Sequence, residues 1–177
     1  MKTVTAAPPW QLQCEALYRE HSARVKNLCR LLLDDPQEAQ EVAQDVFLKL
    51  VRSYQAVDRP AEWGPWLTRV AVNACRDRRR SGWWRWWRQR GVAIEDVEVV
   101  DREATPEQAA LSRETRERIW HGFLQLPSRQ REVLVLRYLE GYSFPEMASA
   151  LGVTTGSVKR HLFRAVQRLR KVLGGES

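Results

Sequence analysis

The stretch SFPEMASALGVTTGSVKRHLFRAVQRLRKVL, residues 143–173, has the pattern of two short helices joined by a sharp turn. Ser143 and Glu146 form an S-x-x-E capping box, and Pro145 falls in the first turn, where its missing N–H costs nothing. Gly152 is placed to end this helix in a left-handed conformation that a side chain would resist. The pattern therefore predicts a helix that begins directly after Ser143 and a turn at Gly152.

The second helix of this stretch divides into an apolar face and a basic face. Thr154 or Thr155 can cap it. The residues expected to face a core are Val158, Leu162, Ala165, Val166, Leu169 and Leu173. The remaining surface carries Lys159, Arg160, Phe163, Arg164, Gln167 and Arg168. Residues 154–173 include six Lys or Arg residues and no acidic residue, which favours an anionic partner.

The capping box, the glycine turn and the one-sided charge together indicate a helix-turn-helix. In this motif the second helix lies in the DNA major groove, with its N-terminal residues on base edges and its flanks on phosphates. We expect Lys159 and Arg160 to reach bases, and Arg164 and Arg168 to lie nearer the backbone. The alternative is a basic amphipathic helix whose charges only keep the surface solvated.

Composition narrows the classes of protein. The 177 residues allow one domain or two small ones, and the net charge of +7 with a pI near 9.8 favours a polyanionic partner. No apolar run fits a signal peptide or approaches the ~20 residues of a membrane span, so a cytoplasmic protein is expected, with at most indirect membrane contact.

Candidate catalytic and metal-binding residues are few. Cys14, Cys29 and Cys75 are too scattered for a disulfide framework or a zinc site. No glycine-rich phosphate loop occurs, and no triad or ligand set with cysteines or carboxylates is formed by His21, His121 and His161. We therefore expect no enzyme activity, no metal, no cofactor and no small-molecule substrate.

The N-terminal half has its own helical periodicity. A helix from Leu12 is expected to end before Asp34, and Asp35, Pro36 and Glu38 form a strong start for the next one. Its core-facing positions are Ala39, Val42, Ala43, Val46, Phe47 and Leu50. A third helix is expected to begin after Trp63-Gly64-Pro65-Trp66, with Leu67, Val70, Ala71 and Ala74 on its apolar side.

Two unusual segments follow this third helix. Seven arginines between Arg76 and Arg90 are interleaved with Trp83, Trp84, Trp86 and Trp87. These tryptophans can fold back as an amphipathic extension, contact nucleic acid or polymerase, or lie in a membrane interface. An acidic cluster over residues 95–103, with little apolar periodicity, then indicates a linker.

The predicted fold is all-α, with two small helical domains joined by a flexible linker. We expect a loose N-terminal arm over residues 1–11, a helical domain over 12–82, the Trp/Arg-rich and then acidic linker over 83–108, and a second helical domain over 109–175. Within the second domain, a helix over residues 131–139 is expected to pack Val133, Leu134, Leu136 and Tyr138.

These elements, in this order, resemble bacterial sigma factors of the extracytoplasmic-function (ECF) type. The similarity covers nearly the whole chain. It rests on LYREHSARVKNLCRLLLDDPQEAQEVAQDVFLKL, on WLTRVAVNACRDRRR and on LPSRQREVLVLRYLEGYSFPEMASALGVTTGSVKRHLFRAVQRLR. Either half alone is moderately specific, because many regulators share the second helix-turn-helix, whereas the pair at this size is highly specific. The four-tryptophan insert departs from the family pattern.

The resemblance implies a dissociable specificity subunit that binds core RNA polymerase and promoter DNA, with an anti-sigma factor as a further partner. By analogy, Gln44, Asp45 and Lys49 would dock on core polymerase. The −10 element would be contacted and melted by Trp63, Trp66, Arg69, Asn73, Arg76 and Arg79. The −35 element would be contacted as duplex by Thr155, Ser157, Lys159, Arg160, Phe163, Arg164 and Arg168.

Each of these roles has an alternative. The predicted polymerase-docking residues could form a solvated face, and Trp66 could be a core residue. The main rival for the whole chain is a helix-turn-helix regulator that binds duplex DNA without being a polymerase subunit. Its C-terminal half would look the same, but the N-terminal half offers a second basic, aromatic element and no sensor pocket.

Overall fold

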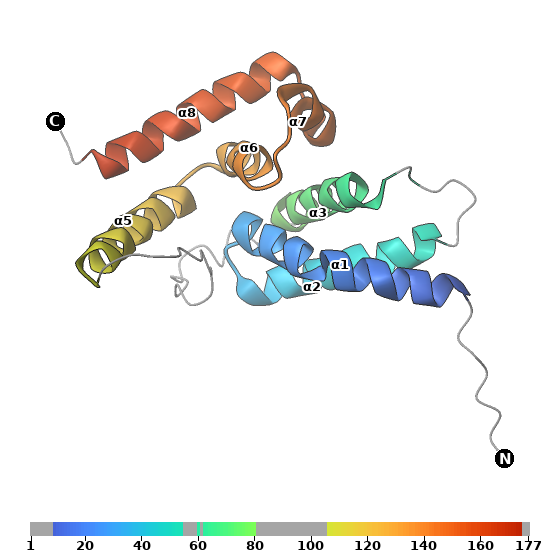
Figure 1. Ribbon diagram of the computed structural model, residues 1–177. Coiled ribbons are helices and arrows are strands. Elements are labelled where there is room, and N and C mark those ends of the chain that lie inside the picture. Colours follow the sequence, from blue (N-terminus) through green and yellow to red (C-terminus); the bar gives the residue numbers. More distant parts are fainter. Residues whose placement is uncertain (1–8, 55–59, 61, 81–105, 175–177) are drawn as a thin grey trace. The chain divides into compact units, whose positions relative to one another are not determined.

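The computed structural model describes residues 9–54, 60, 62–80 and 106–174, which contain seven α-helices and no strand, so the all-α prediction is confirmed (Figure 1). The chain divides into two compact units, residues 1–89 and 90–177. The helices are α1 (Pro9–Leu32), α2 (Pro36–Tyr54), α3 (Trp63–Arg80), α5 (Pro106–Leu124), α6 (Ser128–Tyr138), α7 (Phe144–Leu151) and α8 (Thr155–Leu173).

The first unit is built from α1, α2 and α3, each of which packs against the other two. All six predicted core positions of α2 are buried, from Ala39 to Leu50. The predicted cap is confirmed, because an Asp35 carboxylate oxygen accepts hydrogen bonds from the backbone N–H groups of Gln37 at 2.8 Å and Glu38 at 3.0 Å. The three cysteines are all buried in this unit. The hydropathy pattern of the periodic helices therefore sets which faces meet.

Helix α3 begins at Trp63, earlier than the sequence pattern predicted. Pro65 falls in its first turn, where no backbone N–H is needed. The Gly64 carbonyl accepts hydrogen bonds from the Arg24 guanidinium at 2.8 Å and from the Thr68 hydroxyl at 3.3 Å. Helix α1 thus contacts the first turn of α3 through a long-range hydrogen bond that periodicity does not reveal.

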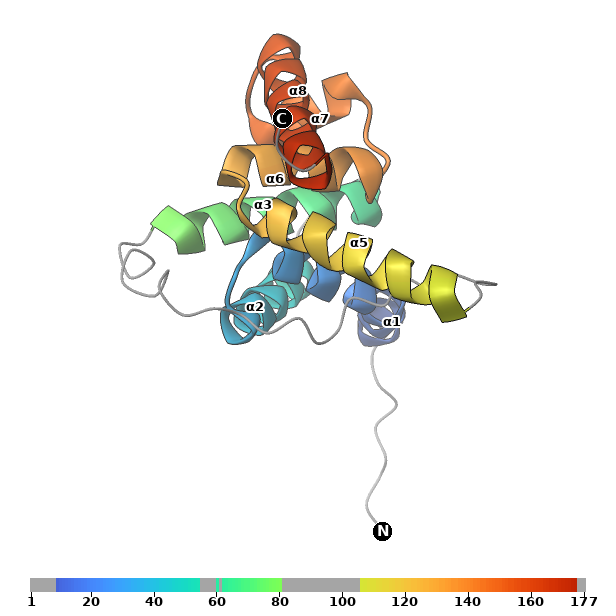
Figure 2. The ribbon, with the colours of Figure 1, turned by 90° about the vertical axis from the view of Figure 1, so that its left-hand side faces the viewer.

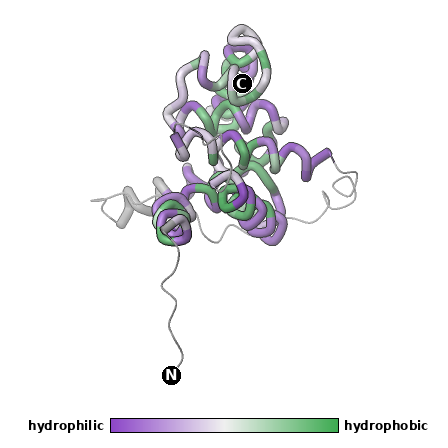
Figure 3. The backbone as a smooth tube through the Cα atoms, turned by 90° about the vertical axis from the view of Figure 1, so that its right-hand side faces the viewer, coloured by the Kyte–Doolittle hydropathy of each residue, from purple (hydrophilic) through white to green (hydrophobic). Residues whose placement is uncertain are grey.

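The second unit is built from α5 to α8, with α8 contacting each of the other three helices. Its core includes Leu126, Leu134 and Ala165, with Phe123, Leu162, Val166 and Leu169 packed against them. Helix α6 begins at Ser128, three residues before the predicted start, because the Pro127 carbonyl accepts from the N–H groups of Gln130 and Arg131 at 2.8 and 3.1 Å. Colouring by hydropathy shows apolar and polar segments alternating along the helices (Figure 3).

Both predicted ends of α7 are confirmed. Ser143 accepts from the Glu146 N–H, and the Glu146 carboxylate accepts from the Ser143 N–H at 2.7 Å. Gly152 has φ of 62°, in the left-handed region. Thr154, and not Thr155, caps α8 by accepting from the Ser157 N–H at 3.2 Å. Figure 2 shows the short α7 beside α8.

Two residues that the sequence predicted to pack in the core are exposed in the structure, Tyr138 and Leu173. Tyr138 is 66% exposed, because it is the last residue of α6 and lies beyond the run from Gln130 to Leu136 that this helix buries. Leu173, in the last turn of α8, is 38% exposed. The N-terminal residues 1–8, the four tryptophans from Trp83 to Trp87 and the acidic segment 95–103 lie outside the described residues. None of the helices that the structure describes is long and apolar enough to cross a membrane.

Candidate nucleic-acid interface

The outer face of α2 carries the residues predicted to dock on a partner. Gln44, Asp45 and Lys49 are all exposed, because they lie opposite the buried run from Ala39 to Leu50. Leu48 lies among them and is 57% exposed. A shallow groove between α2 and α3 brings Asp45, Leu48 and Lys49 next to side chains of α3. The face is therefore charged at its edges and apolar at Leu48.

The exposed stripe of α3 is made of polar and aromatic residues spaced three, four and three apart. This spacing places them along one side of a helix: Trp66, Arg69, Asn73 and Arg76. Arg69 and Asn73 are exposed, and Trp66 and Arg76 are half-buried. Arg80, exposed in the last turn, continues the same spacing. The opposite side of α3 is sunk into the core through Leu67, Thr68, Ala71, Val72 and Cys75.

Other arginines of α3 bind within the protein. The Arg79 guanidinium donates a 3.0 Å hydrogen bond to the Leu32 carbonyl in the last turn of α1. The Arg78 guanidinium lies 3.1 Å from a carboxylate oxygen of Glu41 on α2. Arg79 is thus separated from the stripe with which the sequence grouped it, and its cation lies where the α1 dipole is negative.

The two tryptophans at the start of α3 belong to an aromatic cluster. The ring of Trp63 stacks on Tyr54 of α2, with centroids 5.4 Å apart and an interplanar angle of 19°. Trp66 meets Trp63 edge to face at 5.5 Å. Gln13 of α1 accepts a hydrogen bond from the Tyr54 hydroxyl. Both indoles are half-buried. Because Tyr54 stacks on Trp63, one face of the Trp63 ring is already covered.

In α8 the predicted contact residues remain on the surface. Lys159, Arg160, Phe163, Arg164 and Arg168 are all exposed, whereas Thr155 and Ser157 in the first turn are half-buried. Phe163 is an aromatic side chain with 66% of its surface exposed. Only Val158 and Ala165 of this 19-residue helix are fully buried. The cationic side of α8 is therefore exposed.

Two titratable groups of the second unit have lowered pKa values, His161 and Glu146. Partial burial lowers the pKa of His161, and the positive charges of Arg129, Arg164 and Arg160 lower it further, while Glu132 raises it. The hydrogen bonds in the Ser143 capping box lower the pKa of the Glu146 carboxyl. Over the described ranges 9–54, 62–80 and 106–174, no group of three or more His, Cys, Asp or Glu residues could hold a metal ion.

Two surface residues were missed by the sequence reasoning. Leu48 could have been found, because it is a large apolar residue outside the core pattern of its helix, on the side of Gln44 and Asp45. Arg80 could have been found by extending the spacing of Arg69, Asn73 and Arg76 by four residues.

Comparison with known proteins gives a family for each unit. The family description Sigma-70 region 2 matches residues 17–85, and Sigma-70, region 4 matches residues 116–169. The chain is 33% identical over 161 residues to the ECF RNA polymerase sigma factor SigM of Mycobacterium tuberculosis, covering 90% of this chain and 76% of that protein. It is 29% identical over 155 residues to the ECF RNA polymerase sigma factor SigW of Bacillus subtilis, covering 85% and 83% of the two chains.

A solved structure supports the fold. The sigma factor RpoE from Bartonella quintana, in complex with the anti-sigma factor NepR, has a TM-score of 0.66 and 19% sequence identity, covering 92% of this chain and 98% of that one.

Proposed function

This chain belongs to the ECF sigma factors of the sigma-70 family, and on that premise we propose that it binds core RNA polymerase and directs it to a set of promoters. We assign −10 recognition and core binding to residues 12–82, and −35 recognition to residues 109–175, with the segment between as a tether. The observation that carries the proposal is the pairing of two separately packed units, each with one basic helix that keeps a polar side exposed.

Helix α8 contacts the −35 element as duplex DNA. Its first turn enters the major groove, so that Lys159 and Arg160 reach base edges while Arg164 and Arg168 neutralise phosphates. Thr155, Ser157 and Phe163 complete the contact. The support is the exposure of these cations and the two buried residues by which α8 is anchored, Val158 and Ala165.

Helix α3 contacts the −10 element as its strands separate. Arg69, Arg76 and Arg80 lie near phosphates, and Asn73 offers both a donor and an acceptor to an unpaired base edge. Trp66, which is half-buried, presents an indole to the melted edge. Arg79 acts through the fold, because its guanidinium holds the end of α1.

The α2 face docks on core polymerase. Gln44, Asp45 and Lys49 supply polar contacts around Leu48, whose burial in the complex adds a hydrophobic contribution. Polymerase forms the bonds, and this chain contributes binding energy only. An anti-sigma partner would control the factor by covering these surfaces.

The test is transcription with purified core polymerase. The full chain is mixed with core enzyme and a library of promoter fragments, and the run-off transcripts are sequenced. We expect transcripts that share two upstream elements and that require the chain. Leu48→Arg should abolish complex formation on a sizing column. Glu15→Gln, at an exposed position of α1, is the control and should leave the complex intact.

The result separates the two main possibilities. A polymerase subunit forms a stable complex with core enzyme and opens the template, detected as permanganate-reactive thymines near the start site. If the chain instead bound duplex DNA with the same affinity and specificity without core enzyme, and never joined it, the proposal would be wrong and a helix-turn-helix regulator would be the better description.

A further inference from the structure

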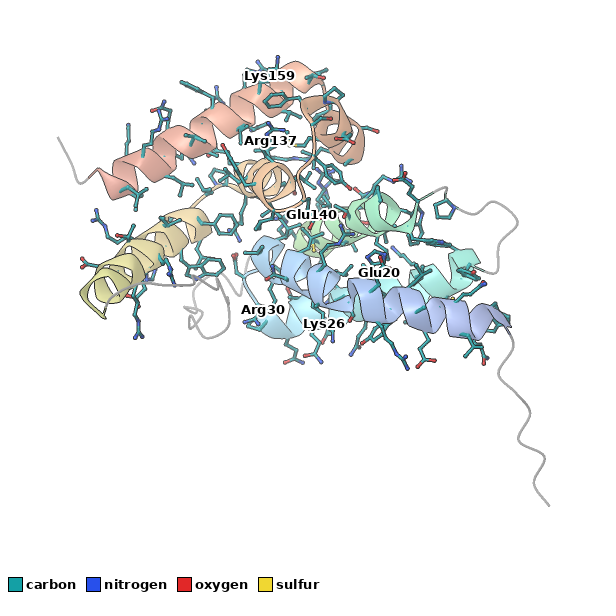
Figure 4. All side chains as sticks on the ribbon, in the orientation of Figure 1. Glu20, Lys26, Arg30, Arg137, Glu140 and Lys159 are labelled. Carbon is teal, nitrogen blue, oxygen red and sulfur yellow. The ribbon has the colours of Figure 1, made fainter. Side chains whose placement is uncertain are left out.

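Two cations of the second unit lie on one aromatic ring. Phe144, the first residue of α7, has the Arg137 guanidinium carbon 5.3 Å from its ring centroid and the Lys159 Nζ 5.4 Å from it. The cations come from different helices, α6 and α8 (Figure 4). Phe144 therefore links the base-contacting end of α8 to the turn that precedes α7.

The ring is held in place by the backbone around it. Ser143, directly before Phe144, forms both hydrogen bonds of the capping box, and Pro145 follows with its restricted φ. The Arg137 guanidinium donates a 3.0 Å hydrogen bond to the Tyr142 carbonyl, so this cation is tied to the same turn. Phe144 is half-buried, and it lines a shallow apolar groove with Leu162. The backbone that carries the ring is therefore held by several hydrogen bonds.

Of the two cations on the ring, Lys159 has the more flexible side chain. A lysine side chain is a long flexible stem that loses much rotamer freedom when its ammonium is fixed by a ligand. A cation held over an aromatic face has already given up part of that freedom, and the attraction at an exposed site is modest. A ring under the ammonium therefore favours the conformers in which Lys159 reaches in one direction.

We propose that Phe144 is a positioning residue that orients Lys159 for base recognition in the −35 duplex. This inference rests on the proposed function, because it assumes that α8 enters the major groove. Phe144 acts on specificity through Lys159, without a base contact of its own. The other cation on the ring, Arg137, is tied to the Tyr142 carbonyl by its hydrogen bond.

A double-mutant cycle tests the proposal. Full-length protein is reconstituted with core polymerase, and binding is measured on a promoter fragment recovered by the transcription experiment. Phe144→Leu, which keeps an apolar side chain, should weaken binding roughly two- to fivefold, the range of an exposed cation–π contact. Phe144→Tyr should retain wild-type affinity, because it keeps the ring. In the Lys159→Ala background, Phe144→Leu should have no further effect.

Specificity and geometry supply independent measurements. Each base pair of the −35 element is substituted in turn, and Phe144→Leu should reduce discrimination at the positions affected by Lys159→Ala. In the free protein, ring currents should shift the NMR signals of the Lys159 ε-methylene, and Phe144→Leu should remove that shift. Thermal unfolding of each variant shows whether the second unit is still folded.

The outcomes distinguish this inference from the proposed function. Failure of the wild-type holoenzyme to bind any fragment overturns the proposed function. Wild-type binding with an equal loss for Phe144→Leu in both backgrounds overturns only the role of Phe144, as does undiminished binding by a folded Phe144→Leu protein. A loss that requires Lys159 and is restored by Phe144→Tyr supports it.

Discussion

The two basic helices, α3 and α8, have similar lengths, but α3 buries more of its residues than α8 does. Helix α3 buries five of its 18 residues, and two of its arginines bind α1 and α2. Helix α8 buries two of its 19 residues fully. A basic charge run therefore has two uses in one chain: in α3 part of it joins the helices together, whereas in α8 most of it faces outward.

This difference separates stability from binding. A substitution in α3 can act on either, depending on which side of the helix it changes, because buried and exposed positions alternate along it. In α8 the exposed face can vary with little effect on folding. Pairs of substitutions, one at a buried and one at an exposed position, test whether stability and binding are separated in this way.

The largest effect is expected at the buried side of α3. Leu67 is fully buried, so Leu67→Ala should lower the free energy of unfolding of the first unit by about 2–5 kcal/mol, through lost apolar contact and a cavity. Leu162→Ala in α8 removes a half-buried leucine and should cost less. Hydrogen–deuterium exchange resolved by peptide measures both units in one protein. Equal losses of unfolding free energy in Leu67→Ala and Leu162→Ala would contradict the difference in burial between α3 and α8.

The next effect concerns the inward arginine of α3. Arg79→Ala should destabilise the first unit by about 1–2 kcal/mol, because it removes a charged donor from the Leu32 carbonyl. Arg80→Ala makes the same change of charge at an exposed neighbour and serves as the control. Urea unfolding measures stability, and permanganate footprinting measures melting. We expect Arg80→Ala to reduce promoter melting more than it reduces stability. A larger loss of stability in Arg80→Ala than in Arg79→Ala would contradict the structural role of Arg79.

A smaller effect is expected at the start of α8. Thr154→Ala should cost about 1 kcal/mol, because the Thr154 hydroxyl accepts from the Ser157 N–H. The neighbouring Thr155→Ala should have little effect on stability, because Thr155 lies inside the first turn. Circular dichroism during urea unfolding compares them. Identical midpoints for the two variants would show that the cap contributes nothing measurable.

The smallest effect is a pH dependence in the second unit. The folded chain holds the pKa of His161 below its ordinary value of 6.5, so protonation favours the unfolded chain. Stability should be fully present above about pH 6.5 and should fall as the pH decreases from 6.5 toward the lowered folded-state pKa. His161→Gln should flatten this slope, with His121→Gln as the control for loss of a histidine. An unchanged slope in His161→Gln would assign it to other groups.

The sequence predicted the fold wherever the signal was local. The Asp35 cap, the capping box at Ser143, the left-handed Gly152 and the apolar run of α2 depend on residues a few positions apart, so their patterns are visible in the chain itself. The start of α3 was predicted too late, because the periodic apolar run begins only at Leu67, and the contact of its first turn with Arg24, 40 residues away in sequence, is not visible in the pattern. Tyr138 was misplaced because α6 is buried on all sides from Gln130 to Leu136, and where this burial ends along the helix depends on the neighbouring helices.

The candidate site divides in the same way. That α8 has a cationic face follows from 3.6-residue periodicity and from the absence of acids. That Arg79 binds Leu32 and that Lys159 lies over Phe144 are results of packing. The sequence by itself determined which helices form and which of their faces are apolar, because these depend on backbone geometry and short-range spacing. Only the tertiary structure decided which charges are used within the protein and which face solvent, because that depends on which atoms of distant helices come within hydrogen-bond range.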